Sequence, residues 1–197
     1  MTIIRTLFLV AVAGCSSAPQ INYYVLASPA DRGALQSSRP VSERVLRLGR
    51  VTLADYLRRP GLVLETEAHR IRPAQYHRWG EPLEYGVRRA LLENLSSSLP
   101  GMRVENGSSQ VRPDYRLEVE IERFHGTEVG LVVLSGRWTL YTGAPGRLVA
   151  SEQFDLRDEI AASGYRASVE TQATLLASLS RTIASHVPEV EAGAREG

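Results

Sequence analysis

The chain has 197 residues, and its 23 basic and 22 acidic side chains leave a formal net charge of +1. This balance argues against nucleic-acid binding, which requires a concentrated positive surface. All 23 basic residues are arginine, which excludes catalytic or phosphate-binding lysines of the phosphate-loop, Schiff-base and kinase types. Because the chain contains one cysteine, packing and not an internal disulfide must hold the fold together.

The N-terminal segment, residues 1–14, has the pattern of a secretory signal: basic Arg5, a short apolar run and small residues at its end. The run is too short to span a bilayer, which needs about 20 apolar residues. Small residues directly before a cysteine resemble the lipobox of bacterial lipoproteins, which makes Cys15 the expected lipidation site. The alternative is an ordinary signal peptide with an incidental cysteine. Residues 15–20 would then form a lipidated N-terminus and short tether, at most about 20 Å long from Cys15 to Ile21.

The first half of the chain predicts strands separated by loops, followed by one helix. The expected strands cover residues 21–26, 45–53 and 62–66, with a loop over 28–43 and a turn through 55–60. Pro82 suits the first turn of a helix. Apolar residues then recur at spacings of three and four, which predicts an amphipathic helix that ends at Pro100. Its apolar stripe consists of Leu83, Val87, Ala90, Leu91, Leu95 and Leu99.

The second half predicts three strands and a closing helix. Residues 114–124 alternate between apolar and charged side chains, the pattern of a strand with one face in solvent. His125 to Thr127 is expected to turn the chain into a strand over 128–142, and a turn at 143–146 leads to a strand over 147–157. Such short connections predict an antiparallel meander. The closing helix is expected over 166–187, with the apolar stripe Val169, Ala173, Leu176, Leu179, Ile183 and Val187.

These elements predict one α+β domain over residues 21–187. We expect two layers: a largely antiparallel sheet with a C-terminal three-stranded meander, covered on one face by two amphipathic helices. Residues 188–197 are expected to be a disordered tail. The sequence contains no internal repeat and no second domain.

Several stretches, in order and spacing, resemble the ABC-type transport auxiliary lipoproteins, the PqiC/YmbA-like family. They are Tyr23-Tyr24-Val25-Leu26, Val51 to Pro60, Arg78-Trp79-Gly80-Glu81-Pro82-Leu83, Asp114-Tyr115-Arg116-Leu117 and the closing helix. The resemblance covers about residues 15–187, and no single motif in it is highly specific. Thr52-Leu53-Ala54 departs from the more usual Leu-Pro of the family.

The resemblance implies a non-enzymatic lipoprotein without cofactors that helps an MCE-type lipid transporter and supports membrane integrity. The expected location of the protein is the periplasmic face of the outer membrane, where palmitate on Cys15 anchors it. Serine at position 16, in place of an aspartate that retains lipoproteins at the inner membrane, agrees with that location. The expected partners are the membrane, an MCE-type protein that spans the periplasm, and further copies of the chain, arranged as a ring. Two alternatives remain open: a lipid-binding module and a pilot or assembly lipoprotein of another envelope complex.

Catalytic and metal sites find little support in the sequence. His69, His77, His125 and His186 lack the spacing of a zinc site, and no Gly-x-Ser-x-Gly motif is present. Glu118, Glu120 and Glu122 share one face of the predicted strand at intervals of about 7 Å. This row indicates a solvated or partner-facing surface more strongly than a catalytic pair.

Two segments are candidates for partner binding. Asp55, Tyr56 and Leu57 form either a packed corner or an exposed anchor. Residues 68–80 contain Arg70, Arg72, Arg78 and Trp79 without any acidic residue. Arginine and aromatic residues are enriched at protein interfaces. The alternative is a loop in which Trp79 and Tyr76 fill the core and the arginines are only solvated.

Overall fold

The structure is a computed structural model that describes residues 19–28, 44–67, 69–107 and 111–188. The elements, in chain order, are β1 (Asn22–Tyr24), β2 (Val45–Leu53), the short helix η2 (Asp55–Arg58), β3 (Gly61–Glu67), β4 (Arg70–Trp79), α1 (Leu83–Ser98), β5 (Arg103–Asn106), β6 (Tyr115–Thr127), β7 (Leu131–Thr142), β8 (Leu148–Glu159) and α2 (Tyr165–Ser185). Cys15, most of the expected 28–43 loop and the expected 188–197 tail except Pro188 lie outside the described residues.

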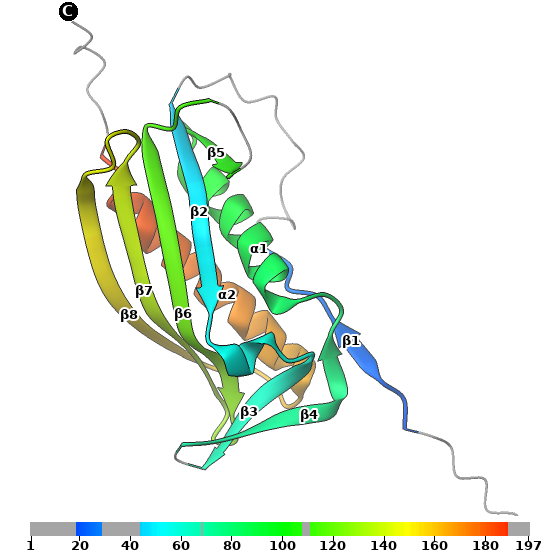
Figure 1. The fold of residues 1–197 in the computed structure, drawn as a ribbon. Helices are drawn as coiled ribbons and strands as arrows, with labels where there is room; N and C mark the ends of the chain where they lie inside the picture. The colour runs from blue at the N-terminus through cyan, green and yellow to red at the C-terminus, as the bar shows by residue number, and fades with distance from the viewer. Residues whose placement is uncertain (1–18, 29–43, 68, 108–110, 189–197) are drawn as a thin grey trace, which may run out of the picture.

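All eight described strands belong to one mixed sheet, in which β6 is central (Figure 1). One edge of β6 pairs in parallel with β2 and β3, and its other edge pairs antiparallel with β7, which pairs antiparallel with β8. β4 pairs antiparallel with β3 and parallel with β1, while β5 pairs parallel with β2. The expectation of a largely antiparallel sheet is therefore corrected, because the sheet is mixed; antiparallel pairing runs in succession through its C-terminal strands β6, β7 and β8. The alternating pattern of a strand records which face is buried but not the direction of its neighbour.

Three local expectations are also corrected. Residues 70–79 form the strand β4 and not a loop, and β5 was not predicted at all. β4 is exposed along most of its length and contains Pro73, so it lacks the apolar alternation that marks a half-buried strand. The expected turn at His125–Thr127 is the last part of β6, and the chain turns instead at residues 128–130.

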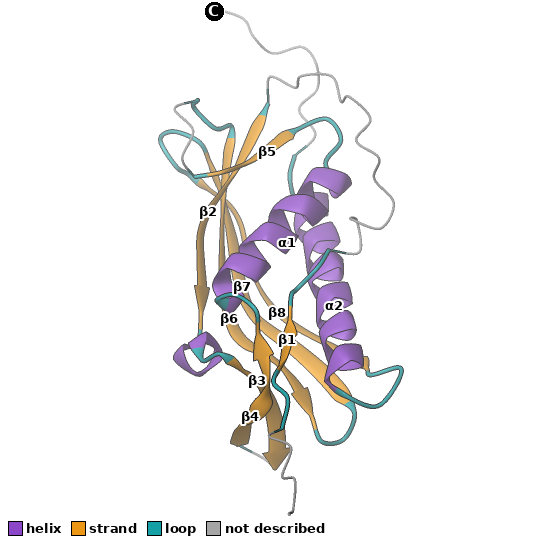
Figure 2. Ribbon diagram, turned by 90° about the vertical axis from the view of Figure 1, so that its right-hand side faces the viewer, coloured by secondary structure: helices purple, strands orange, loops and turns teal. Residues whose placement is uncertain are grey.

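α1 and α2 cover one face of the sheet, as Figure 2 shows. The apolar side chains of β6 face them: Tyr115, Leu117, Val119 and Ile121 are buried, while Arg116, Glu120 and Glu122 are exposed. The predicted stripes of both helices are buried, with Leu99 partly buried at the end of α1. Burial of these facing surfaces supplies the main stabilisation of the two layers.

Two arginines on α1 attach the helix to neighbouring backbone. Arg88 donates hydrogen bonds to the carbonyl oxygens of Leu48 (3.4 Å) and Gly49 (3.0 Å), where the register of β2 shifts. Arg89 pairs with Glu81 at 2.6 Å and donates to the carbonyl oxygen of Leu26 at 3.2 Å. These contacts join α1 to the irregular part of β2 and to the chain after β1.

Gly136 on β7 lies too close to β6 for any larger residue. A Cβ atom at this position would lie 1.9 Å from the carbonyl oxygen of Glu120. We expect Gly136→Ala to lower the free energy of unfolding by about 2 kcal/mol or more, because backbone must move. Gly101→Ala is the matched control, since nothing lies within 4 Å of the added atom. Chemical denaturation that shows the same stability for both variants would contradict this prediction.

Candidate interaction surface

The short helix η2 forms a packed corner beside the end of β6. Leu57 is only 1% exposed and belongs to the core, and Tyr56 is partly buried. The Tyr56 hydroxyl donates to the carbonyl oxygen of Glu122 at 3.0 Å. Asp55, by contrast, is fully exposed and lies 3.7 Å from Arg58. Of the three residues predicted at this corner, Asp55 alone presents its whole side chain to a partner.

Burial controls the protonation of two side chains at this corner. The Tyr56 ring lies edge-on to the imidazole of His125, with 5.9 Å between ring centroids. Desolvation raises the pKa of Tyr56 to about 12 and lowers the pKa of His125. Both rings are therefore neutral at physiological pH, which suits a packed corner.

The arginines predicted for partner binding all lie on β4, but they form two groups. Arg70 and Arg72 lie near the turn between β3 and β4 and pair with Glu67 and Glu128, each at 3.2 Å. Both are well exposed, so these ion pairs contribute little to stability. Arg78 lies at the other end of β4, beside β1. Trp79 is 7% exposed and packs in the core, so its side chain is not available to a partner.

β1 and the end of β4 share an outer face rich in exposed aromatic and apolar residues. β1 pairs in register with β4, so that Tyr23 lies opposite Arg78 and Tyr24 opposite Trp79. Tyr23 is 64% exposed and Tyr76 is 37% exposed. The sequence analysis assigned β1 correctly as a strand but missed this face. The available signal was the run of apolar side chains on both faces of residues 21–26.

The inner face of the same strand pair is attached to α2. The Tyr24 hydroxyl and His77 Nδ1 are 2.8 Å apart, and the His77 ring stacks on Tyr165 with 4.0 Å between centroids. Tyr165 is the first residue of α2. β1 is therefore linked through β4 to the helical layer, although it is only three residues long.

A hollow of about 420 Å³ lies between β3, the end of β6 and the start of α2. Its walls include Leu62, Leu64 and Ile160 together with the polar residues Ser168 and Gln172. Gln172 is 3% exposed, its Nε2 donates to the carbonyl oxygen of Phe124 at 3.2 Å, and its Oε1 has no hydrogen-bond partner. This hollow combines apolar walls with a few polar groups, as ligand pockets do.

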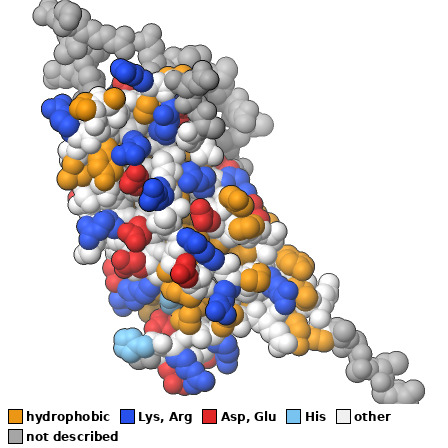
Figure 3. Space-filling model, viewed as in Figure 1, with side chains coloured by type: hydrophobic (Ala, Val, Ile, Leu, Met, Phe, Trp, Pro, Cys, Tyr) orange, Lys and Arg blue, Asp and Glu red, His pale blue; other side chains and the backbone are white. Residues whose placement is uncertain are grey.

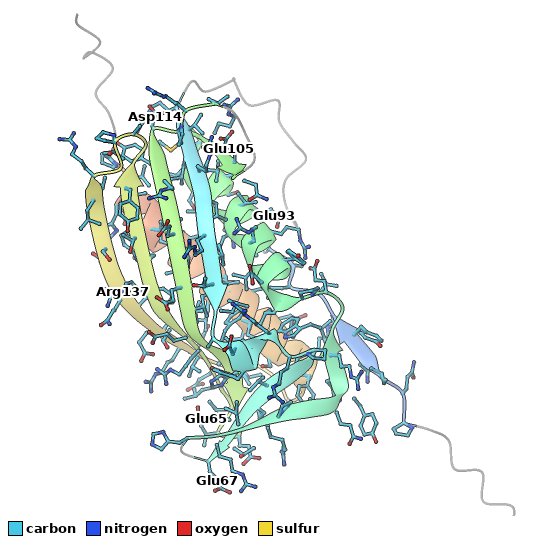
Figure 4. All side chains as sticks on the ribbon, in the orientation of Figure 1. Glu65, Glu67, Glu93, Glu105, Asp114 and Arg137 are labelled. Atoms are coloured by element: carbon cyan, nitrogen blue, oxygen red, sulfur yellow. The ribbon has the colours of Figure 1, made fainter. Side chains whose placement is uncertain are left out.

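The row of glutamates on β6 lies among arginines on the face of the sheet away from the helices. Glu118 lies 3.2 Å from Arg116, and Glu120 faces Arg137 on the paired strand β7. Figure 4 labels Arg137 on this part of the sheet, and places Glu65 and Glu67 at the opposite end of the molecule from Glu105 and Asp114. The arrangement is that of a charged, mutually neutralised sheet surface.

Within the described ranges, no group of three or more histidine, aspartate or glutamate side chains could hold a metal ion. Neither α1, α2 nor any other helix in that part of the chain is long and apolar enough to cross a membrane.

Comparison with known proteins places the chain in a family. Residues 24–184 match the ABC-type transport auxiliary lipoprotein component family. The chain is 32% identical over 180 residues to the intermembrane transport lipoprotein PqiC of Escherichia coli K12, covering 89% of this chain and 91% of that protein. The same values hold for PqiC of Shigella flexneri.

Solved structures show the same fold. A crystal structure of an uncharacterized protein has a TM-score of 0.73 and 30% identity, covering 86% of this chain and 99% of the other. A protein from Xanthomonas campestris, at 17% identity, has a TM-score of 0.62 over 82% of this chain and 92% of its own. The chain therefore belongs to the ABC-type transport auxiliary lipoprotein family, as the sequence analysis predicted, and is similar to PqiC.

The Tyr56 corner gives a test in alkaline solution. We expect Tyr56→Phe to lower the free energy of unfolding by about 1 kcal/mol below pH 10, because the hydrogen bond to Glu122 is lost. The raised pKa means that the unfolded chain, with an ordinary phenol pKa of about 10, loses its proton first. The Tyr56 contribution should therefore fall as the pH rises from 10 through 12.

Denaturation at pH 9 and pH 11 measures this effect, and the gap between wild type and Tyr56→Phe should be smaller at pH 11. Tyr85→Phe, at an exposed position, is the control and should show no such change. An equal gap at both pH values would contradict the assignment.

Proposed function

We propose that this protein is a non-enzymatic outer-membrane lipoprotein that docks an MCE-type lipid transporter at the periplasmic face of that membrane. The observation that carries the proposal is the match of residues 24–184 to a family of transport auxiliary lipoproteins, whose relatives here are named intermembrane transport lipoproteins. A role as an auxiliary subunit also agrees with a sheet surface on which Glu118 pairs with Arg116 and Glu120 lies opposite Arg137.

In this proposal the chain is divided into an anchor and a docking domain. Residues 1–14 are the signal peptide, Cys15 is acylated, residues 15–20 are the tether, residues 21–187 are the domain and residues 188–197 are a disordered tail. Two or more acyl chains give stable attachment, since each buried CH₂ contributes about 0.8 kcal/mol. The short tether keeps the domain at the membrane, so the transporter has to reach across the periplasm.

Self-association of the domain into a ring is supported by the charges on two separate edges of the sheet. β4 carries Arg70, Arg72 and Arg78 without any acidic residue, whereas β8 carries four acidic residues and one arginine. Figure 1 shows the start of β8 and the β1–β4 pair on opposite sides of the molecule, whereas the end of β8 lies beside the turn between β6 and β7, where Arg72 pairs with Glu128. A contact between unlike edges is heterologous and, if it closes, produces a ring. A ring would match a tubular partner with rotational symmetry.

A second candidate function is the binding of a lipid monomer. The hollow of about 420 Å³ beside Leu62, Leu64 and Ile160 favours it, because apolar walls could take part of an acyl chain. Incubation of the pure protein with radiolabelled phospholipid in detergent would test this role. Equal retention by the wild type and by Leu64→Glu, which places a charge in the hollow, would argue against it.

Anchoring through Cys15 can be tested by metabolic labelling with palmitate. We expect label on the wild type and none on Cys15→Ala, which should be released into the periplasm or keep its signal peptide. Ser17→Ala, two residues further along, is the control and should be labelled like the wild type. Equal labelling of Cys15→Ala and wild type would exclude this anchor.

Charge reversal on β4 tests self-association. We expect Arg70→Glu combined with Arg72→Glu to weaken association by tenfold or more, because the acidic edge of the next copy would meet like charges. The circular-dichroism melting curve should hardly change, since both ion pairs are exposed. Sedimentation velocity measures the association.

Two further variants complete that experiment. Asp158→Arg with Glu159→Arg on β8 should restore association of the β4 variant, because the complementary charges would be exchanged. Arg181→Glu on the exposed side of α2 is the control and should associate like the wild type. A strictly monomeric wild type at high concentration would refute the ring.

A further inference from the structure

Residues 21–26, which include β1, carry apolar or aromatic side chains on both sides apart from Asn22, although only one side is buried. The inner side leads into the core through Leu26, which is 1% exposed, and Tyr24, which is partly buried. The outer side presents Ile21, Tyr23 and Val25, which are 37%, 64% and 55% exposed. A strand that served only the core would have polar residues on the outer side. The outer side of β1 therefore has the composition of a contact surface.

Neighbouring elements extend this surface. Tyr76 and Arg78 share the outer side of β4 with Tyr23, because Tyr23 lies opposite Arg78 in the parallel ladder. Val25 lies over Gly80, where an added Cβ would be 3.4 Å from Val25 Cγ2. We call Ile21, Tyr23, Val25, Tyr76 and Arg78 the β1 patch. Figure 3 shows hydrophobic and arginine side chains side by side over this end of the molecule.

A further exposed tyrosine, Tyr85, lies on the first turn of α1. Its side chain is 62% exposed. At the adjacent Gly86, an added Cβ atom would lie 3.4 Å from the Cβ atom of Leu26. No acidic residue occurs in β1 or β4, and the nearby Glu81 is paired with Arg89. Asp158 and Glu159 at the end of β8 border the patch, where they line a depression together with Val25. The patch thus combines aromatic, aliphatic and cationic groups.

The position of the patch identifies what it contacts. Its first residue, Ile21, lies six residues after Cys15, so a fully extended tether separates the two by about 20 Å at most. In an acylated protein the bilayer is therefore held permanently within reach of this end of the domain. Such tethering gives the bilayer a high effective concentration, in contrast to a partner that has to diffuse to the patch.

The chemistry of the patch also suits a bilayer surface. Tyrosine is enriched at the membrane–water interface, where its ring lies at the level of the headgroups. Aliphatic side chains gain from burial below the headgroups, and arginine is attracted to anionic lipids. We propose that the β1 patch lies against the lipid headgroups of the membrane that holds the anchor, which gives the protein a second point of attachment.

This inference rests on the proposed acylation of Cys15 and adds an orientation to it. The β1 patch faces the bilayer, whereas Arg70 and Arg72 near the other end of β4 and the acidic residues of β8 lie outside the patch. The acyl chains supply the affinity, whereas the patch stops the domain from rotating about its tether. A fixed orientation would present the same surface of every copy to the transporter.

The experiment uses the complete lipidated protein in vesicles of phosphatidylethanolamine and phosphatidylglycerol. Once Cys15 is acylated, the chain has no other thiol, so an introduced cysteine can be labelled uniquely with an environment-sensitive dye. Tyr23→Cys and Tyr76→Cys report on the patch, and Gln153→Cys on the exposed part of β8 is the matched control. Spin-labelled lipids in the vesicle measure the proximity of each dye to the headgroups.

We expect the two patch positions to be quenched at least threefold more strongly than Gln153→Cys, even at one protein per vesicle. Equal quenching at all three positions would overturn the inference. If the dye on Tyr23→Cys became shielded from solvent only at high protein density, and was not quenched by the lipids, the patch would be a contact with a second copy. That result would also overturn the inference. Vesicle flotation is measured separately: loss of flotation in every variant would refute the anchor, whereas flotation with uniform quenching would refute only the patch.

Discussion

The pairing of β6 along both edges is the constraint on which the rest of the structure depends. β2 and β3 occupy successive parts of one edge, and β7 follows the whole of the other. Because its side chains alternate, β6 defines an apolar face for the helices and a charged face for solvent. A shift of one residue would exchange these faces, so every neighbouring strand inherits its register from β6. Gly136 allows β7 to approach β6 closely where the ladder is irregular.

The N-terminal strand is held by side chains more than by its own ladder. β1 pairs over only three residues, which is too short to be stable alone. Leu26 in the core, the hydrogen bond from Arg89 to its carbonyl oxygen, and the contact of Tyr24 with His77 attach it to both layers. A pulling force on the tether would therefore act on the sheet and on α2 together.

Different parts of the surface are suited to different partners. The β1 patch lies next to the tether, β4 and β8 carry unlike charges on separate edges, and the hollow beside Leu64 lies between the sheet and α2. An auxiliary subunit has to meet a membrane, its own copies and a transporter without one contact blocking another. Spatial separation of these surfaces makes simultaneous contacts possible.

The sequence by itself determined the elements whose side chains face two different environments. The strand at Val45–Leu53, the alternation along β6 and the stripes of both helices are amphipathic, so their periodicity records which side is buried. The same order of motifs was enough to assign the family. Periodicity also indicated that β1 is a strand, but it did not show that its outer face stays exposed.

Only the tertiary structure decided which strands pair and which candidate residues reach the surface. β4 and β5 lack a buried apolar face, and strand direction depends on long-range contacts that leave no local pattern. In the sequence alone, Leu57 and Trp79 resemble Tyr23 and Tyr76, because all four are apolar or aromatic residues near turns or strand ends. The first two lie in the core and the others in solvent, because burial is set by the packing of distant elements and not by residue type.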